Sequence, residues 1–213
     1  MNKNSQRLMF EFLNKNGIDN FVGVPDSTMK HLIYHAIKKK SIIIATKEEE
    51  AIGIATGMSL AKSPSLVFMQ NAGFGNSIST ITSLVQLYEI PLIFLIGWRG
   101  YLPNDAPEHT KFGKIQPEII KSLGLKSKIL SDSNWKKSCK WALTQLKANK
   151  PSQIQVIDIF INSGDLYRIT TTDNLLNRTV LTLNPPLFKG LIPIGVLERL
   201  GGSIVVNVVC FGF

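Results

Sequence analysis

Short apolar segments alternate with helical segments through most of this 213-residue chain, and this alternation constrains the fold more than any other feature. The segment Pro91–Ile96 contains no polar residue, which is typical of a strand buried on both faces of a sheet. Strands separated by helices pair in parallel through right-handed crossovers. We therefore expect an α/β fold with a doubly wound, parallel six-stranded sheet and helices on both faces, the strands being 21–24, 41–46, 65–70, 91–96, 126–130 and 153–159.

The segments between these strands show helical spacing of apolar residues or helix-boundary signals. A long loop is expected at 97–113, and Pro117 is expected to open the helix that follows it. The expected helices are 5–16, 29–37, 51–61, 77–88, 117–124 and 133–147.

The alternation stops after Ser163. We expect one domain over residues 1–163 and an irregular C-terminal tail over 164–213, either a truncated linker or the start of a missing domain. Within that tail, Ile204–Val209 has the composition of one more strand.

Composition narrows the possible partners of the chain. Its 24 Lys and Arg outnumber its 15 Asp and Glu, giving a net charge of +9, but they are scattered, and the longest run is Lys38–Lys40. No basic stretch is interleaved with aromatic residues, so we do not expect nucleic-acid binding. The two cysteines, Cys139 and Cys210, lie far apart and suggest neither a disulfide framework nor a metal site. The polar start of the chain and the short apolar run Ile90–Trp98 predict no signal peptide and no membrane span, hence a cytoplasmic protein.

Polar side chains follow the first four expected strands. They are Asp26 and Ser27, then Glu48, then the stretch Asn71–Asn76, and then Arg99 and His109. The carboxyl ends of parallel strands meet at one edge of a sheet, where α/β proteins bind ligands. We expect these groups to converge there.

Each of these groups also has a purely structural interpretation. Asp26 or Ser27 can cap a helix, and Glu48 can complement a helix dipole. His109 can be an ordinary surface histidine, and Arg99 can simply pair with Glu108.

The residues Gly73 and Gly75 form a Gly-x-Gly turn before an expected helix, so their backbone N–H groups could bind an anion. A dinucleotide fingerprint needs a third glycine, but Ser77 and Ile78 follow Asn76. This argues against NAD.

Taken together, these segments resemble the pyrimidine-binding half of thiamine diphosphate-dependent 2-oxo acid decarboxylases, of the phosphonopyruvate decarboxylase type, with sulfopyruvate decarboxylase as a near relative. The resemblance covers about residues 1–160. It rests on 23–27, 48–57, 69–77, 96–100 and Glu108-His109, which occur in the family's order and spacing. The segment Gly97-Trp98-Arg99-Gly100 favours the phosphonopyruvate type.

The resemblance implies roles for particular residues. Glu48 would hydrogen-bond N1′ of the cofactor's aminopyrimidine and so promote loss of the proton from thiazolium C2. His109 would join Glu48 as a catalytic residue, and Gly73, Gly75 and Asn76 would lie at the cofactor. Asp26 or Ser27 would face the substrate. Separately from the resemblance, we expect Arg99 to bind the substrate as an anchor for its phosphonate.

The resemblance also implies a missing part. The family binds diphosphate and Mg²⁺ through a second domain with a Gly-Asp-Gly motif, whereas this chain contains no Asp-Gly, and its Gly164-Asp165 is followed by Leu166. We therefore expect thiamine diphosphate to be shared with a diphosphate-binding domain or subunit in a homo- or hetero-oligomer, Mg²⁺ to be bound only by that partner, and this chain to supply no metal ligand.

The expected function is decarboxylation of a 2-oxo acid, phosphonopyruvate to phosphonoacetaldehyde in the first instance, with the isolated chain inactive. One alternative is an α-type subunit of sulfopyruvate decarboxylase. Others are a truncated or frame-shifted remnant acting only as an interaction module, and a flavodoxin-like binder of a small molecule.

Overall fold

The computed structural model describes residues 1–103, 105–148, 151–156, 181–182, 194–200 and 203–209. The chain divides into two compact units, Met1–Ile161 and Asn162–Phe213. The predicted domain boundary at residue 163 falls outside the described residues and stays a prediction.

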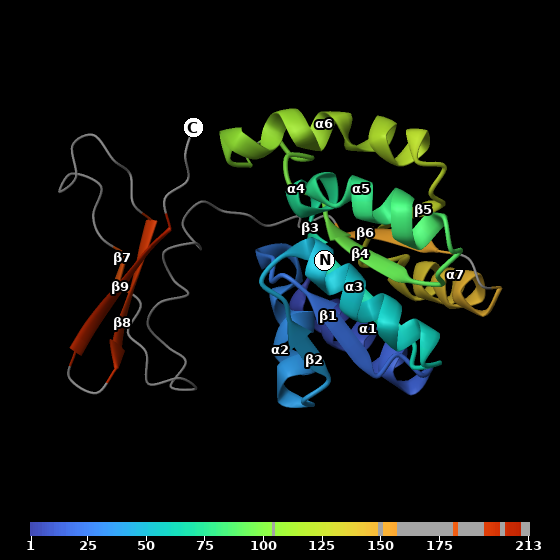
Figure 1. The fold of residues 1–213 in the computed structure, drawn as a ribbon, viewed down its shortest axis with the longest axis horizontal. Coiled ribbons are helices and arrows are strands. Elements are labelled where there is room, and N and C mark those ends of the chain that lie inside the picture. The colour runs from blue at the N-terminus through green and yellow to red at the C-terminus, as the bar shows by residue number, and fades with distance from the viewer. Residues whose placement is uncertain (104, 149–150, 157–180, 183–193, 201–202, 210–213) are drawn as a thin grey trace. The chain divides into compact units, whose positions relative to one another are not determined.

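A parallel sheet forms the centre of the first unit (Figure 1). Its strand order is β2-β1-β3-β4-β6-β5, and every pairing is parallel. The predicted α/β fold with a parallel sheet and helices is confirmed. The strands are β1 (Asn20–Gly23), β2 (Ile42–Ile44), β3 (Ser65–Gln70), β4 (Ile93–Gly97), β5 (Ser127–Leu130) and β6 (Ser152–Val156).

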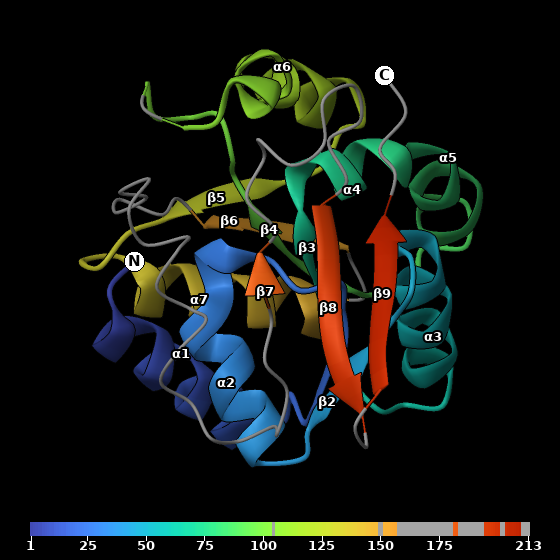
Figure 2. The ribbon, with the colours of Figure 1, turned by 90° about the vertical axis from the view of Figure 1, so that its left-hand side faces the viewer.

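Helices cover both faces of this sheet (Figure 2). Successive strand residues point to opposite faces: Phe68 packs with the first group of helices below, and Val67 with the second. The first group is α1 (Lys3–Lys15), α2 (Lys30–Lys38) and α7 (Trp135–Lys147), and the second is α3 (Glu48–Leu60), α4 (Asn71–Asn76), α5 (Ile78–Thr80), η2 (Ile81–Gln86) and α6 (Pro107–Ser122).

A buried glutamine fixes the turn after β1. The Gln6 amide donates to the carbonyl of Thr28 at 3.0 Å, and its Oε1 accepts from the backbone N–H groups of His31 and Leu32. It therefore caps α2, whose own N-cap residue, Met29, makes no side-chain cap. This contact holds the short helix η1 (Ser27–Met29), and with it Asp26, against α1.

The expected loop 97–113 and helix 117–124 were wrong, because α6 begins at Pro107 and runs through Pro117. A proline inside a helix leaves the carbonyl four residues earlier without its usual donor. Here that carbonyl belongs to Gly113, and the indole Nε1 of Trp98 donates to it at 2.8 Å. The hydrogen bond from the Trp98 indole thus replaces the backbone hydrogen bond to Gly113 that Pro117 cannot donate.

This compensation gives a first prediction. We expect Trp98→Phe to lower the free energy of unfolding by about 1–3 kcal/mol, because it leaves the Gly113 carbonyl unpaired. Adding Pro117→Ala restores a donor, so it should stabilise the Trp98→Phe variant by about 1 kcal/mol more than it stabilises the wild type. Urea unfolding of the four proteins measures this coupling, and strictly additive effects would contradict it.

The remaining helix predictions also need one correction. Asn71–Asn76 is a helix, α4, so the Gly-x-Gly turn expected there is wrong. Both glycines admit neighbouring side chains instead: a β-carbon at Gly75 would come 2.5 Å from the ring of Phe112 in α6. Close packing of α4 determines the local conformation more than glycine's freedom to form a turn.

The second unit contains an antiparallel sheet of order β7-β8-β9, comprising β7 (Leu181–Thr182), β8 (Ile194–Leu200) and β9 (Ser203–Val209). The predicted strand at 204–209 is confirmed. β7 and β8 are described strands within the tail that was expected to be irregular, while Gly164 and Asp165 lie outside the described residues.

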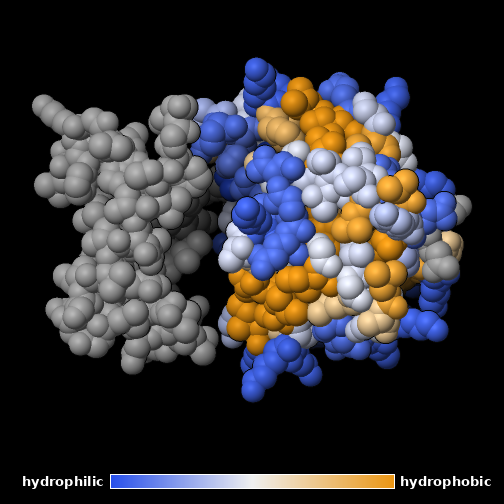
Figure 3. All heavy atoms as spheres, viewed as in Figure 1, coloured by the Kyte–Doolittle hydropathy of each residue, from blue (hydrophilic) through white to orange (hydrophobic). Residues whose placement is uncertain are grey.

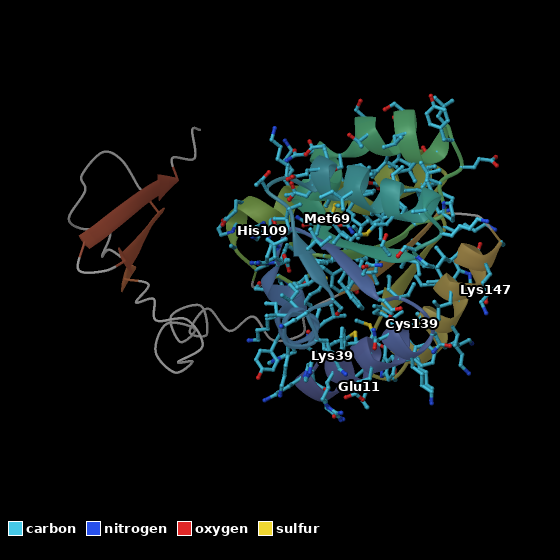
Figure 4. All side chains as sticks on the ribbon, turned by 60° about the horizontal axis from the view of Figure 1, so that its bottom comes forward. Glu11, Lys39, Met69, His109, Cys139 and Lys147 are labelled. Atoms are coloured by element: carbon cyan, nitrogen blue, oxygen red, sulfur yellow. The ribbon has the colours of Figure 1, made fainter. Side chains whose placement is uncertain are left out.

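The free cysteine Cys139 belongs to α7 and is buried in the core between this helix and its neighbours (Figure 4). Burial raises the pKa of its thiol to about 12, which makes it inert near neutral pH. Cys210 lies outside the described residues. Within the part of the chain that the structure describes, no group of three or more His, Cys, Asp or Glu side chains could hold a metal ion.

The visible surface of the first unit mixes hydrophilic and apolar side chains (Figure 3). Its most exposed large apolar residues include Leu60, Leu87 and Tyr88, at the ends of α3 and η2. Among the described residues, no helix is long and apolar enough to cross a membrane. The cytoplasmic location stays a prediction.

Candidate functional site

The strand order reverses between β1 and β3. In open α/β sheets, ligands bind at such a reversal, beside the carboxyl ends of the strands. β1 pairs with β2 on one side and with β3 on the other, so the chain leaves β1 and β3 in opposite directions. Asp26 and Ser27 follow β1, Glu48 opens α3 after β2, and Asn71 opens α4 after β3. The predicted polar groups therefore follow strands whose carboxyl ends share this edge.

Glu48 is set apart from the two glutamates that follow it. Oε2 of Glu50 accepts from the backbone N–H and the hydroxyl of Thr46, at 2.7 and 2.6 Å, so Glu50 caps the helix. The half-buried Glu48 carboxyl instead lies against Gly73 of α4, in the space that a β-carbon at position 73 would fill. Gly73 thus makes room for the Glu48 carboxyl group at this edge of the sheet.

Only one of the two carboxylate oxygens of Asp26 accepts hydrogen bonds within the described structure. Oδ1 accepts from the N–H of Thr28 at 2.7 Å and from its hydroxyl, which confirms the capping interpretation for that oxygen. Oδ2 is buried and has no hydrogen-bond partner among the described residues. Gly97 lies next to this carboxylate, because a β-carbon at position 97 would come 2.8 Å from Oδ1 of Asp26. An unpaired buried carboxylate oxygen is costly unless a ligand pairs with it.

Arg99 forms a buried ion pair that the sequence interpretation missed. Its guanidinium binds the carboxylate of Asp105 with an Nη2–Oδ1 distance of 2.6 Å, and the two side chains are 8 % and 5 % exposed. Nη1 reaches the hydroxyl of Ser27 at 3.3 Å. The alternative of an ion pair with Glu108 is wrong, because Asp105 takes that place.

His109 lies in the first turn of α6 rather than in a loop (Figure 4). Its backbone N–H donates to the carbonyl of Ala106 at 3.0 Å. Its own carbonyl packs against Gly100, whose φ of +75° and lack of a β-carbon permit the approach. Burial, together with the nearby charge of Arg99, lowers the pKa of the imidazole. His109 is therefore neutral at neutral pH and able to accept a proton.

Asn71 connects two parts of the site, where it was expected only as part of the stretch Asn71–Asn76 and without a role of its own. Its Nδ2 donates to the carbonyl of Arg99 at 2.8 Å, which fixes the orientation of the amide. The buried Oδ1 then has no partner among the described residues. Gly73 and Gly75 are packed, and Asn76 is exposed at the end of α4.

The family of the chain follows from its N-terminal half. Residues 3–116, which contain all the groups above, match the family of the thiamine pyrophosphate enzyme N-terminal TPP-binding domain. The chain belongs to this family. Thiamine pyrophosphate is the same compound as thiamine diphosphate, so the resemblance seen in the sequence is confirmed.

Several proteins named as decarboxylases or their subunits are similar to this chain in sequence. The α subunit of sulfopyruvate decarboxylase from Methanococcus maripaludis is 31% identical over 122 residues, covering 56% of this chain and 73% of the relative. The corresponding subunit from Methanocaldococcus jannaschii is 37% identical over 108 residues, covering 50% and 64%. Phosphonopyruvate decarboxylase from Streptomyces viridochromogenes is 28% identical over 120 residues, covering 55% of this chain but 30% of the relative.

Two solved structures share the fold. Benzoylformate decarboxylase from Polynucleobacter necessarius has a TM-score of 0.54 at 19% identity, covering 72% of this chain and 29% of that one. The 2-oxoglutarate:ferredoxin oxidoreductase from Magnetococcus marinus has a TM-score of 0.56 at 14% identity, covering 74% and 29%. At these identities, the likeness supports the fold of the TPP-binding domain alone.

The ion pair between Arg99 and Asp105 makes the stability of this TPP-binding domain depend on pH in the acid range. Burial alone would raise the pKa of Asp105, but hydrogen bonds from Arg99, Gly100 and Ala106 outweigh burial and hold it at about 2, against a usual 3.8. A carboxyl whose pKa is lower in the folded state stabilises the fold above its unfolded pKa. That stabilisation is lost as the pH falls through the folded pKa.

We therefore expect the free energy of unfolding to fall by about 1–2 kcal/mol between pH 4 and pH 2 through Asp105 alone. Asp105→Asn should remove this part of the acid dependence. Asp132→Asn is the matched control, because Asp132 caps Asn2 at an exposed position and should contribute less. Urea unfolding at several pH values measures both, and equal acid dependence of Asp105→Asn and wild type would contradict the assignment.

Proposed function

We propose that this chain is the pyrimidine-binding half of a thiamine diphosphate-dependent 2-oxo acid decarboxylase whose substrate carries a terminal sulfonate or phosphonate. The observation that carries the proposal is the Glu48 carboxyl held over Gly73 at the point where the strand order reverses. The names of the relatives support the reaction class. When bound, the cofactor's thiazolium ring supplies the electron sink that decarboxylation of a 2-oxo acid requires.

The described residues fit the aminopyrimidine end of that cofactor. A carboxyl group with space reserved for it suits a proton shared with a ring nitrogen, and Glu48 would hold this proton at N1′. The unpaired buried oxygens of Asp26 and Asn71 are acceptors for donor groups of a bound ligand. Each of these groups favours a polar ligand at this edge rather than an apolar one.

Three residues would serve the substrate's side of the reaction. His109 is neutral near neutral pH and half-buried, so it would accept or return a proton during turnover. Asp26 would orient and exchange a proton with the substrate through Oδ2, because Oδ1 is held by Thr28. Ser27 would contribute a hydroxyl beside Arg99.

The diphosphate end of the cofactor would be held by another domain or subunit. The chain matches 73% and 64% of two relatives named as α subunits, but 30% of the phosphonopyruvate decarboxylase. The first two relatives are named as α subunits, which supports a chain that works together with a partner subunit.

Sulfopyruvate and phosphonopyruvate share a 2-oxo acid and a tetrahedral oxyanion. The segment around Arg99 favoured the phosphonate, whereas relatives named for sulfopyruvate reach 37% identity. The test is to mix the purified chain with a diphosphate-binding subunit, thiamine diphosphate and Mg²⁺, and to measure CO₂ release from each substrate and from pyruvate. We expect turnover of one or both oxyanion substrates only in the mixture.

A non-catalytic interaction module is the rival proposal. It shares the fold and predicts that the mixture forms a complex but releases no CO₂ from any of the three acids. Size-exclusion chromatography of the same mixture reports complex formation separately from turnover. A complex without turnover would favour the module, and CO₂ release that requires the chain would exclude it.

A further inference from the structure

We propose that Asp105 is a positioning residue for the substrate end of the site, because it selects which edge of the Arg99 guanidinium faces Ser27. The inference rests on the proposed function, and it assigns to Asp105 control over how the terminal oxyanion of the substrate is recognised. Asp105 need not touch the substrate itself.

The contacts of Asp105 show how it holds Arg99. Oδ1 accepts from Nε at 3.1 Å and from Nη2 at 2.6 Å, while Oδ2 accepts from Nε at 3.0 Å. These bonds occupy the Nε–Nη2 edge of the guanidinium, as in paired Arg–carboxylate contacts generally. The nitrogen left to reach across to the β1 loop is Nη1, which meets the hydroxyl of Ser27 at 3.3 Å.

The Arg99–Ser27 contact is long compared with the bonds to Asp105. A bond of 3.3 Å lies beyond the usual range for strong hydrogen bonds, so an oxyanion can replace or share it at small cost. An oxyanion placed there would meet a nitrogen whose direction is already fixed. Pre-orientation of this kind raises affinity because little side-chain freedom is lost on binding.

The same carboxylate also fixes the backbone around the site. Oδ2 accepts from the N–H of Gly100 at 2.6 Å, and Oδ1 accepts from the N–H of Ala106 at 2.8 Å. The carbonyl of Ala106 in turn accepts from the N–H of His109. Asp105 therefore links the backbone of Gly100 to the start of α6. A substitution at Asp105 should alter the positions of both Arg99 and His109.

The kinetic test uses Asp105→Asn in the reconstituted enzyme. The variant keeps the shape of the side chain but loses the charge and one acceptor oxygen, so Arg99 can turn away from Ser27. We expect KM for the oxyanion substrate to rise about tenfold or more, which corresponds to about 1.4 kcal/mol, with kcat changed less than threefold. An unchanged KM would overturn the proposal, as would a loss confined to kcat.

The matched control for charge removal is Glu11→Gln. Glu11 pairs with Arg7 at 2.7 Å on the surface of α1, with both side chains 40 % or more exposed. Removing it should leave KM and kcat unchanged. Asp105→Glu keeps the charge on a longer side chain, and we expect KM to stay raised in this variant, because the bidentate geometry is lost.

Nuclear magnetic resonance of the full chain without a partner separates positioning from activity. The Arg99 Nε–H signal should be protected from exchange in wild type and lost in Asp105→Asn. The charges facing His109 are Arg99, Asp105, Glu108 and Asp26, so removing Asp105 should lower the pKa of His109 further. Glu11→Gln should instead lower the pKa of His35. Burial and the positive charges of Arg7, Lys38 and Lys3 lower this pKa, whereas the negative charge of Glu11 raises it.

The two readouts distinguish the two ways of failing. If no mixture with wild type turns over any substrate, the proposed function fails, and with it the role in recognition, whatever the spectra show. If wild type is active but Asp105→Asn retains both the protected Arg99 signal and the wild-type KM, the positioning role fails alone. The expected result is activity in wild type with coupled loss of the Arg99 signal and of substrate affinity in the variant.

Discussion

Glu48→Gln is expected to lower kcat of the reconstituted enzyme by about 10²–10⁴-fold while leaving the chain folded and able to bind its partner. Glutamine keeps the shape of the side chain and its fit against Gly73, but it cannot hold or exchange a proton. The loss should appear in kcat for every substrate that turns over. CO₂ release at saturating substrate and cofactor measures it.

Glu50→Gln supplies the control in the same helical turn. Glu50 caps α3 through Thr46, and glutamine keeps an acceptor for this cap, so the variant should stay folded with kcat within a fewfold of wild type. Equal losses of kcat in Glu48→Gln and Glu50→Gln would mean that both act only through the stability of α3. That outcome would remove the proposed role of Glu48.

Gly73→Ala is expected to have the second-largest effect, a fall in kcat/KM of at least about 10²-fold. The new β-carbon would overlap the Glu48 carboxyl, which must then leave its position. Misplacement of a reacting group by about 1 Å can cost such a factor. The overlap should also destabilise the isolated chain by about 1–3 kcal/mol, measurable by urea unfolding.

Gly53→Ala is the matched control for this substitution. Gly53 lies within α3, and a β-carbon there would meet nothing within 4 Å, so alanine should stabilise the isolated chain by about 0.5–1 kcal/mol. In a second control, Glu48→Ala should relieve the overlap in Gly73→Ala and recover stability without recovering activity. Gly73→Ala with wild-type activity would contradict the placement of Glu48.

Most of the fold could be predicted from the sequence because apolar strands and amphipathic helices leave regular patterns. β3 was predicted with the bounds that the structure gives it. The helix α6 was missed over its first half because Pro117 is a strong local signal for a helix start. The bond from Trp98 to Gly113 that lets the helix continue through Pro117 joins residues 15 apart, and no local pattern reveals it.

The site was predicted only as far as topology determines it. Polar groups after parallel strands share an edge, and this was enough to select Asp26, Glu48 and Arg99. Asp105 was missed, and Asn71 was expected only within the stretch Asn71–Asn76, because their partners depend on the conformation of the loop after β4. The sequence did contain a weak signal for Asp105, an acid six residues after Arg99 in the same loop. The roles proposed for all site residues stay predictions until the variants are measured.

The most direct test of the central claim is calorimetric titration of thiamine diphosphate with Mg²⁺ into the chain alone, into a diphosphate-binding subunit alone, and into their mixture. If the chain supplies only the aminopyrimidine half of the site, neither component alone will bind the cofactor with the affinity of the mixture. Glu48→Ala should then weaken binding in the mixture. Binding to the chain alone as tight as to the mixture would contradict the account, as would a mixture that binds no more tightly than the diphosphate-binding subunit by itself.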